Sequence, residues 1–430
     1  MANIVITHFS PFLYNKAYQS CVFYDGLIKG FTEEGHNILQ IITSDFLKRA
    51  WNGSNQPFSN KAKYKVLNKI KSYKPDLIIS FNNSSISGIE EIVDCPIALW
   101  NADNFEFFND KNCIKKNPDR YHYMSFLEYG IKNYKDNLNI KEHQVCRVPG
   151  ATAVRNKNEE KKYNISFIGH PFFKSDNLVQ LLNDHPELID ISETEIDKNN
   201  EKISKLLREN NVKDFELKYH KTSDIRTQLI TNLLPLKPTV FGPPAWLRLA
   251  TLSCNYIGIY NSKTVLNLDD NEKVYNQSQI SISTNHAQNK EGYPWRIHDI
   301  LASSSVLLSE YRHELKNDFS KIKNLQLFNS PSEAYDMAKY LLENKSYRTD
   351  IINQQNEIID ESYRWKHRLP LIQQLTNVDL INTPNKLGTH ELFRLKNRLP
   401  SARNTRHKRI IKCFLKELGL KKKKLKTNNF

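Results

Sequence analysis

The chain has 430 residues, of which 39% are hydrophobic and 11% aromatic; this is more than one typical core needs, so we expect two domains. Its six Cys residues are scattered without CxxC spacing, which excludes a disulfide framework or a zinc cluster and favours a reduced cytoplasmic setting. The net charge of +15 is concentrated in residues 391–430, where 14 Lys and Arg stand against two Glu, so a strongly basic body is also excluded.

Strands and helices alternate in the first third of the chain. The N-terminal segment passes directly into an apolar run, and no window holds the roughly 20 apolar residues of a membrane helix, so neither a signal peptide nor a membrane span is predicted. Strands are expected at 3–7, 38–43, 75–80 and 96–100, and helices at 17–35 and 60–73. This alternation predicts a parallel, doubly wound, Rossmann-like domain over residues 1–155.

The alternation starts again after a charged, Asn-rich linker at 152–162. Strands are expected at 163–169, 215–219, 238–241, 255–259, 279–283, 305–309 and 324–328. Helices are expected at 176–183, 199–210, 294–304, 332–343 and 346–367. These elements predict a second Rossmann-like domain over residues 160–375, which faces the first across a cleft.

One loop and the helix after it carry the most informative pattern. Gly292 permits a positive φ, and Pro294 suits the first turn of a helix whose free N–H groups would face a bound anion. Arg296 adds a forked donor for a diphosphate. If the helix starts early enough, Glu291 and Asp299 lie near one line, one at the mouth of the helix and one inside it. Acids at such places can accept hydrogen bonds from sugar or ribose hydroxyls. An ordinary amphipathic helix with solvated acids is the alternative interpretation.

The last predicted unit, residues 376–430, is a basic helical extension. Between 404 and 426 the apolar residues fall on one helical face while Lys and Arg cover the rest, as in helices that lie on a membrane surface. We expect residues 401–430 to bind an anionic membrane. Contact with nucleic acid is not expected, because the near-neutral body holds no recognisable binding module. A solvated helix, or one that binds a partner protein, remains an alternative.

Several short motifs occur in the order found in a known family: KPDLIIS at 74–80, LWNAD at 99–103, NISFIG at 164–169, YNQSQI at 275–280, RIHDILA at 296–302 and YRWKHR at 363–368. Together they resemble glycosyltransferases of the GT-B fold, and within them the group related to the spore maturation protein CgeB. Asp299 stands where that group has Glu, and Ser304 and Ser305 replace glycines that follow the helix. The resemblance implies that the second domain holds a nucleotide sugar and the first an acceptor.

The resemblance also implies roles for the loop and helix. Arg296 and the backbone at Gly292 and Tyr293 would stabilise the departing phosphate, Asp299 would bind ribose, and Glu291 would act at the donor sugar. No metal is expected, since the chain has no Asp-x-Asp triplet.

Further candidates lie at predicted strand ends. Gly169 would let the backbone approach the donor phosphate, and His170 could donate a hydrogen bond to it. Asp103 and His8 are the candidates for a catalytic base that faces the acceptor hydroxyl. Two more candidate donor contacts are Trp246, with core packing as its alternative, and Ser278 in the YNQSQI motif.

We therefore expect a cytoplasmic glycosyltransferase, peripheral at the inner face of the cell membrane. It would move a sugar from a nucleotide sugar to a bacterial surface polysaccharide or lipid-linked glycan. Hexosyl and Kdo-type donors both stay open, because a His-Pro pair such as His170-Pro171 also occurs in transferases that use cytidine-monophosphate sugars. A nucleotide-sugar 2-epimerase, or a non-catalytic relative that binds glycan or membrane, is the alternative.

Overall fold

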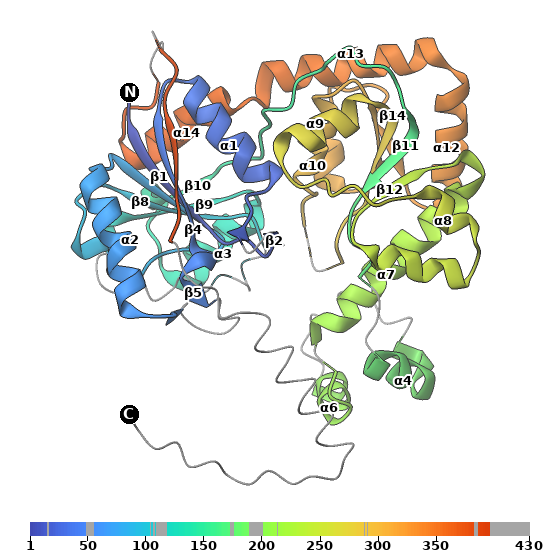
Figure 1. Cartoon of the computed structure of the whole chain (residues 1–430), viewed down its shortest axis with the longest axis horizontal. Helices are drawn as coiled ribbons and strands as arrows, with labels where there is room; N and C mark the ends of the chain where they lie inside the picture. The colour runs from blue at the N-terminus through green and yellow to red at the C-terminus, as the bar shows by residue number, and fades with distance from the viewer. Residues whose placement is uncertain are drawn as a thin grey trace.

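The computed structural model describes residues 1–14, 17–48, 56–103, 105, 108, 118–172, 176–188, 201–212, 214–287, 289, 291–381 and 386–395. Two α/β bodies lie side by side, each built on one parallel sheet (Figure 1). The expected fold class of two Rossmann-like domains is therefore confirmed. The predicted membrane-binding segment, 401–430, lies outside the described residues.

The first domain is built on a sheet of seven parallel strands in the order β10-β9-β8-β7-β1-β4-β17. Its strands are β1 (Asn3–His8), β4 (Asn37–Ile42), β7 (Leu77–Phe81), β8 (Ile97–Asn101), β9 (Tyr121–Ser125), β10 (Val145–Arg147) and β17 (His390–Phe393). Its helices are α1 (Val22–Glu33), α2 (Asn60–Tyr73) and α3 (Glu128–Leu138), and short hairpins pair β2 (Leu13–Tyr14) with β3 (Ala17–Tyr18) and β5 (Leu47–Lys48) with β6 (Gln56–Pro57). The central strands are nearly continuous apolar runs because helices cover both faces of the sheet.

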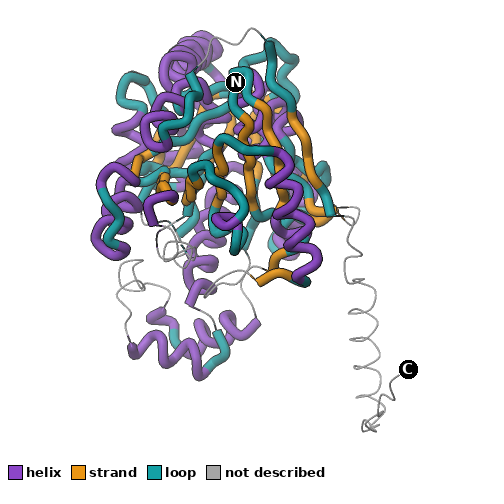
Figure 2. Tube along the Cα trace, turned by 90° about the vertical axis from the view of Figure 1, so that its left-hand side faces the viewer, coloured by secondary structure: helices purple, strands orange, loops and turns teal. Residues whose placement is uncertain are grey.

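The second domain is built on a sheet of six parallel strands in the order β13-β12-β11-β14-β15-β16. Its strands are β11 (Tyr163–Ile168), β12 (Thr239–Phe241), β13 (Tyr260–Asn261), β14 (Ser278–Ser283), β15 (Val306–Glu310) and β16 (Gln326–Phe328). Its helices are α4 (Asp176–Asp184), α6 (Glu201–Glu209), α7 (Asp214–Leu233), α8 (Asn255–Ile259), α9 (Leu268–Asn276), α10 (Arg296–Leu301), α11 (His313–Asp318), α12 (Pro331–Glu343) and α13 (Lys345–Ser362). Helices α4 and α6 lie apart from the two sheets (Figure 1), and the same helices are seen at the lower end of Figure 2. Leu178, Leu181 and Leu207 of this part form a small core of their own.

Two of the expected strands are wrong. Residues 215–219 lie inside the long helix α7, and residues 255–259 form the short helix α8. Both are short runs that mix aromatic and aliphatic residues, and periodicity alone cannot assign such runs to strand or helix.

The chain returns to the first domain at its C-terminal side. Helix α13 runs along the second domain, and α14 (Leu369–Thr376) then packs against β10 of the first (Figure 1). Strand β17 follows and pairs in parallel with β4, with His390 opposite Ile38. This strand was not predicted, and it falls within the C-terminal extension that was expected to be helical.

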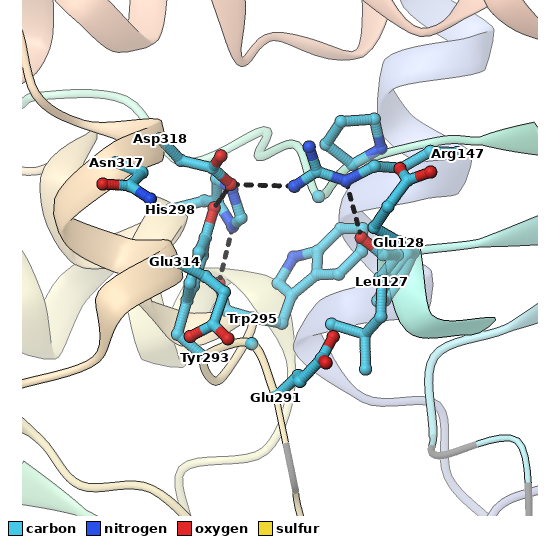
Figure 3. A pocket seen from close by; sticks show the side chains of 14 residues that line it. Leu127, Glu128, Arg147, Glu291, Tyr293, Trp295, His298, Glu314, Asn317 and Asp318 are labelled. Carbon is cyan, nitrogen blue, oxygen red and sulfur yellow. Dashed lines mark hydrogen bonds and ion pairs between the residues drawn. The ribbon is translucent and has the colours of Figure 1, made fainter. Parts of the chain in front are cut away.

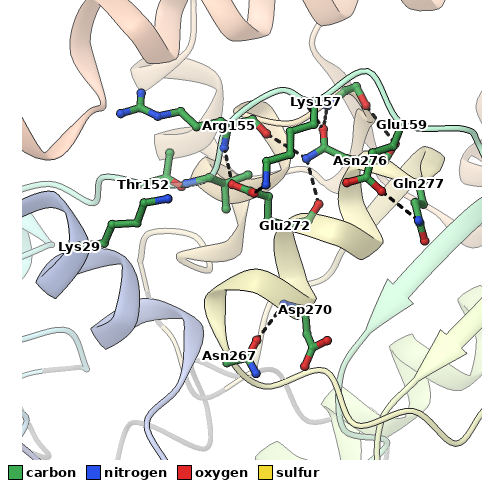
Figure 4. Close-up of polar contacts among 12 residues, drawn as sticks. Lys29, Thr152, Arg155, Lys157, Glu159, Asn267, Asp270, Glu272, Asn276 and Gln277 are labelled. Atoms are coloured by element: carbon green, nitrogen blue, oxygen red, sulfur yellow. Dashed lines mark hydrogen bonds and ion pairs between the residues drawn. The ribbon is translucent and has the colours of Figure 1, made fainter. Parts of the chain in front are cut away.

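The linker between the domains is held along helix α9 by hydrogen bonds (Figure 4). The backbone N–H of Arg155 donates to Glu272 Oε2 at 2.9 Å, and that of Lys157 donates to Asn276 Oδ1 at 2.9 Å. Helix α9 also contacts α1 of the first domain, where the Leu268 N–H donates to Asp25 Oδ2 at 3.3 Å. The linker and α1 thus meet the second domain on the same helix.

None of the described helices combines the length and the apolar character needed to span a membrane.

Candidate functional site

The carboxyl ends of the second-domain strands carry the predicted donor site. Open parallel sheets bind ligands at this edge, where the loops after the strands meet. Gly169 and His170 follow β11, a central strand of the sheet, and the backbone N–H of Gly169 donates to the Phe241 carbonyl at the end of β12. The structure therefore places Gly169 and His170 at the strand end where they were predicted.

Arg226 of α7 brings a buried positive charge to the same edge. Its side chain is 4% exposed, its Nη1 donates to the His170 carbonyl at 2.6 Å, and its Nε donates to Thr284 Oγ1 at 3.0 Å. Within the described part of the chain, no carboxylate lies within ion-pair distance of its guanidinium. The charge of Glu310 acts on Arg226 from beyond that distance. Because a buried charge that lacks a direct ion pair is costly, this arginine is positioned to receive an anion.

Arg296, at the start of α10, reaches the end of the same strand. Its Nη1 donates to the Ile168 carbonyl at 2.6 Å, so its guanidinium lies beside Gly169. Like Arg226, it forms no direct ion pair with a carboxylate of the described residues, although its charge acts on Asp299. We call Arg226 and Arg296, together with the backbone at Gly169 and His170, the cationic edge.

The positive charge at the cationic edge contributes to lowered pKa values of groups in and around it. Burial, and then the charge of Arg296, lowers the pKa of Arg226 to about 9. Burial, and then the charge of Arg226, lowers the pKa of His286 to about 4. The pKa of His170 is lowered by the same two causes. Both imidazoles are therefore neutral near pH 7, and the arginines supply the charge for an anionic ligand.

Two other predicted donor contacts are buried in the second domain. Trp246 is 3% exposed, packs edge-on against Phe167 and donates from Nε1 to the Gly169 carbonyl at 2.9 Å. It thus occupies the core position that was its alternative, and it supports the loop after β11. Ser278 is fully buried at the amino end of β14, where its hydroxyl donates to the Val274 carbonyl at 2.6 Å. The structure therefore separates Ser278 from the strand ends where the other candidates lie.

Asp299 faces the linker between the domains. It is 2% exposed, and its Oδ1 accepts a hydrogen bond from Thr152 Oγ1 at 2.6 Å. Burial raises its pKa to about 7, although the Thr152 hydrogen bond and Arg296 act in the opposite direction. In this arrangement Asp299 joins α10 to the linker, and its carboxylate is turned away from an open surface.

Glu291, Gly292 and Tyr293 line a pocket of about 170 Å³ between the two domains (Figure 3). Gly292 has the predicted positive φ, at +78°, and a Cβ there would lie 2.3 Å from Leu127 Cδ2 of the first domain. The positive φ favours glycine at this position, and a larger side chain would also require Leu127 to shift.

An ion pair closes one side of this interdomain pocket. Arg147 Nη2 and Asp318 Oδ2 lie 3.0 Å apart, and the Tyr293 hydroxyl donates to the same Asp318 oxygen at 2.7 Å. Arg147 is the last residue of β10 and Asp318 the last of α11, so the two domains are joined here by charge as well as by packing.

The two predicted bases differ in accessibility. His8 ends β1, is fully buried, and stacks on Tyr24 with ring centroids 3.8 Å apart. Its Nε2 accepts from Gln40 Nε2 at 2.9 Å, and burial lowers its pKa to about 3. Asp103 is half-buried just beyond the carboxyl end of β8, and its backbone N–H donates to Asn101 Oδ1 at 3.2 Å. Neither residue lines the interdomain pocket.

Sequence reasoning missed Arg226, Arg147 and His298. A single arginine within a polar helix has no local signature, and Arg226 becomes notable only because α7 buries it at the end of β11. His298 was visible within the RIHDILA motif, but that motif does not show that its ring lines the pocket.

A family model described as "Glycosyl transferase-like" matches residues 226–375. No curated protein matches the chain. A glycosyltransferase structure from Rickettsia africae is 12% identical with a TM-score of 0.47, covering 87% of this chain and 98% of that one.

Two further solved structures have a similar extent of coverage. T4 phage BGT in complex with its UDP-glucose substrate is 10% identical with a TM-score of 0.47, covering 87% of this chain and 99% of that one. A sucrose-phosphate synthase from Thermosynechococcus elongatus is 9% identical with a TM-score of 0.48, covering 88% and 98%. The match to the family model lies within the second domain and begins at Arg226 of the cationic edge.

Proposed function

We propose that this protein is a glycosyltransferase that moves a sugar from a nucleotide-sugar donor to a bacterial surface polysaccharide or a lipid-linked glycan. The observation that carries the proposal is the cationic edge, where Arg226 and Arg296 converge without a direct ion pair to a carboxylate of the described residues. Both arginines lie within residues 226–375, which match the glycosyl transferase-like family model. Membrane binding by residues 401–430 and membership of the CgeB-like group remain part of the proposal.

The chemistry of transfer explains why two arginines would be placed there. The acceptor oxygen forms a bond to the anomeric carbon of the donor while the bond from that carbon to the phosphate oxygen breaks. Negative charge then develops on the departing nucleotide. The guanidinium groups of Arg226 and Arg296 would stabilise that charge, and the low polarity around a side chain that is 4% exposed strengthens the effect. Under this proposal the reaction needs no metal.

The first domain would supply the acceptor and a base for its proton. Asp103 suits this role better than His8, because Asp103 is half-buried whereas the His8 ring is fully enclosed and already accepts from Gln40. We expect Asp103→Asn to abolish turnover with little effect on donor binding. A variant His8→Asn that lost turnover while Asp103→Asn kept it would reverse this assignment.

A thermal-shift screen of nucleotides and nucleotide sugars tests the donor site. A ligand that binds only the folded protein raises the melting temperature. We expect nucleoside diphosphates and their sugars to do so for the wild type, and the shift to be much smaller in Arg226→Gln and Arg296→Ala. Lys339→Gln, which removes an exposed cation from α12 of the same domain, is the matched control and should keep the shift.

Product analysis then decides between transfer and its alternatives. Transfer of the sugar to an acceptor supports the proposal, whereas an isomerised donor would indicate an epimerase. No ligand-induced shift with any nucleotide, or an undiminished shift in Arg226→Gln, would contradict the proposed donor site.

A further inference from the structure

The interdomain pocket has a charge opposite to that of the cationic edge. Its lining holds the carboxylates Glu128, Glu291, Glu314 and Asp318, against one cationic side chain, Arg147. Glu128 comes from the first domain, while the other three acids come from the second, and they surround one space (Figure 3). Only Asp318 forms an ion pair with Arg147. The pocket therefore carries an excess of negative charge.

Mutual repulsion among these acids is visible at Glu291. Burial raises the pKa of this carboxyl group, and the charges of Glu314 and Glu128 raise it further. Opposing this, the backbone N–H of Tyr129 at the start of α3 donates to Glu291 and lowers the pKa. A cation in the pocket would relieve the repulsion.

An independent observation comes from His298. Its side chain is 2% exposed and lines the pocket, and its Nε2 has no hydrogen-bond partner among the described residues. The other ring nitrogen, Nδ1, lies 3.2 Å from the Trp295 carbonyl, which can only accept, so Nδ1 carries the proton. Nε2 of this neutral imidazole is consequently an acceptor that lacks a donor. Together with the carboxylates, it calls for a ligand rich in N–H or O–H groups.

Aromatic side chains complete the lining and limit the kind of cation. Phe126, Tyr293 and Trp295 line the pocket, with the Phe126 and Trp295 rings 4.5 Å apart. Aromatic faces attract organic cations. No set of three or more His, Cys, Asp or Glu side chains in the described ranges is arranged to hold a metal ion, which favours an ammonium group over a metal. The volume, about 170 Å³, is below the roughly 300–1,000 Å³ of pockets for drug-sized ligands, so it suits one small ring.

We propose that the interdomain pocket binds the ammonium group of an amine-bearing sugar, so that one of the two sugars in the transfer is an amino sugar with a free amine. The proposal rests on the proposed function for the identity of the ligand as a sugar. The acids would accept from the ammonium group, and His298 Nε2 would accept from an N–H or a hydroxyl.

Calorimetric titration with D-glucosamine and with N-acetyl-D-glucosamine tests this directly. The two probes share the ring, but only the first carries a positive charge. We expect D-glucosamine to bind at least tenfold more tightly than its acetylated form. The double variant Glu128→Gln and Glu314→Gln should lose at least tenfold in D-glucosamine affinity, and Glu357→Gln on the exposed face of α13 should lose nothing.

Equal affinity for the two sugars, absence of D-glucosamine binding, or unchanged affinity in the double variant would overturn the proposal. The nucleotide-induced melting shift, measured on the same samples, separates this result from the proposed function. If the shift persists while D-glucosamine fails to bind, only the ammonium pocket is wrong. If D-glucosamine binds but no nucleotide does, only the donor site is wrong.

Discussion

The cationic edge and the interdomain pocket differ in charge although one short segment contributes to both. Glu291 and Tyr293 line the acidic pocket, and Arg296, a few residues later, turns to the end of β11. The cationic edge holds two arginines that form no ion pair among the described residues, whereas four carboxylates and one arginine line the interdomain pocket. Residues close together in the sequence thus contribute to an anion site and to a cation site, because the fold places their side chains in different surroundings.

The largest expected effect concerns Asp299, the acid on α10 that lies nearest in sequence to Arg296. Its folded-state pKa of about 7 is above the ordinary value of 3.8, so the folded protein holds the proton more tightly than the unfolded chain. The contribution of Asp299 to the free energy of unfolding should therefore fall as pH rises from about 4 to about 7 and stay level above that. At about 1.4 kcal/mol per pKa unit, the drop is on the order of 4 kcal/mol.

Asp299→Asn should remove this part of the pH dependence, as measured by chemical denaturation between pH 4.5 and 8. The result sharpens the comparison, because a protonated Asp299 cannot neutralise Arg296. Parallel pH profiles for the variant and the wild type would show that Asp299 is ionised throughout, and the cationic edge would then carry less charge than we infer.

The next effect is on nucleotide binding by the two arginines. Loss of one charge-assisted hydrogen bond costs about 1.5–3 kcal/mol. Arg226→Gln and Arg296→Gln should therefore each weaken the binding of a nucleoside diphosphate about 10- to 100-fold. If both guanidiniums hold one diphosphate, their effects should be coupled in a double-mutant cycle. Calorimetric titration of the two single variants and the double variant measures this coupling. Strictly additive losses would mean that the arginines do not share a ligand.

A smaller effect, on the stability of the fold, is expected at Gly292, where the loop before α10 contacts the first domain. Gly292→Val places a Cβ at φ +78° and in collision with Leu127, which should destabilise the fold by about 1–3 kcal/mol. Adding Leu127→Ala should recover the steric part of the loss in a thermal melt. Gly258→Ala is the matched control, because a Cβ there meets nothing within 4 Å. A Gly292→Val protein as stable as the wild type would mean that neither the positive φ nor the Leu127 contact restricts this position.

The smallest effect on stability should come from Arg147, the one cationic side chain that lines the interdomain pocket. The Arg147 side chain is 36% exposed, so its ion pair with Asp318 contributes less than about 1 kcal/mol, and Arg147→Gln should barely change the melting temperature. The same variant should bind D-glucosamine a few-fold more tightly, because a competing positive charge is gone. Weaker binding would mean that Arg147 itself contacts the sugar.

The sequence predicted the fold better than the site. Apolar runs such as Leu77–Phe81 form strands because both faces of a parallel sheet are covered, and this demand is visible in local composition. Strand β17 is exposed along most of its length and pairs with a strand some 350 positions away, so its local sequence carries no such signal. At the site, Gly292 was predictable from its backbone, whereas the burial of Arg226 and the orientation of Asp299 depend on packing between distant segments.

The pairing of β17 with β4 has a consequence for synthesis. Strand β4 leaves the ribosome early, but its outer edge has no partner until residues 390–393 follow, after the entire second domain. An unpaired strand edge is a template for association between chains. A fragment that ends at residue 155 would thus expose this edge permanently, and expression of the first domain by itself should yield aggregates unless β17 is supplied as a separate peptide.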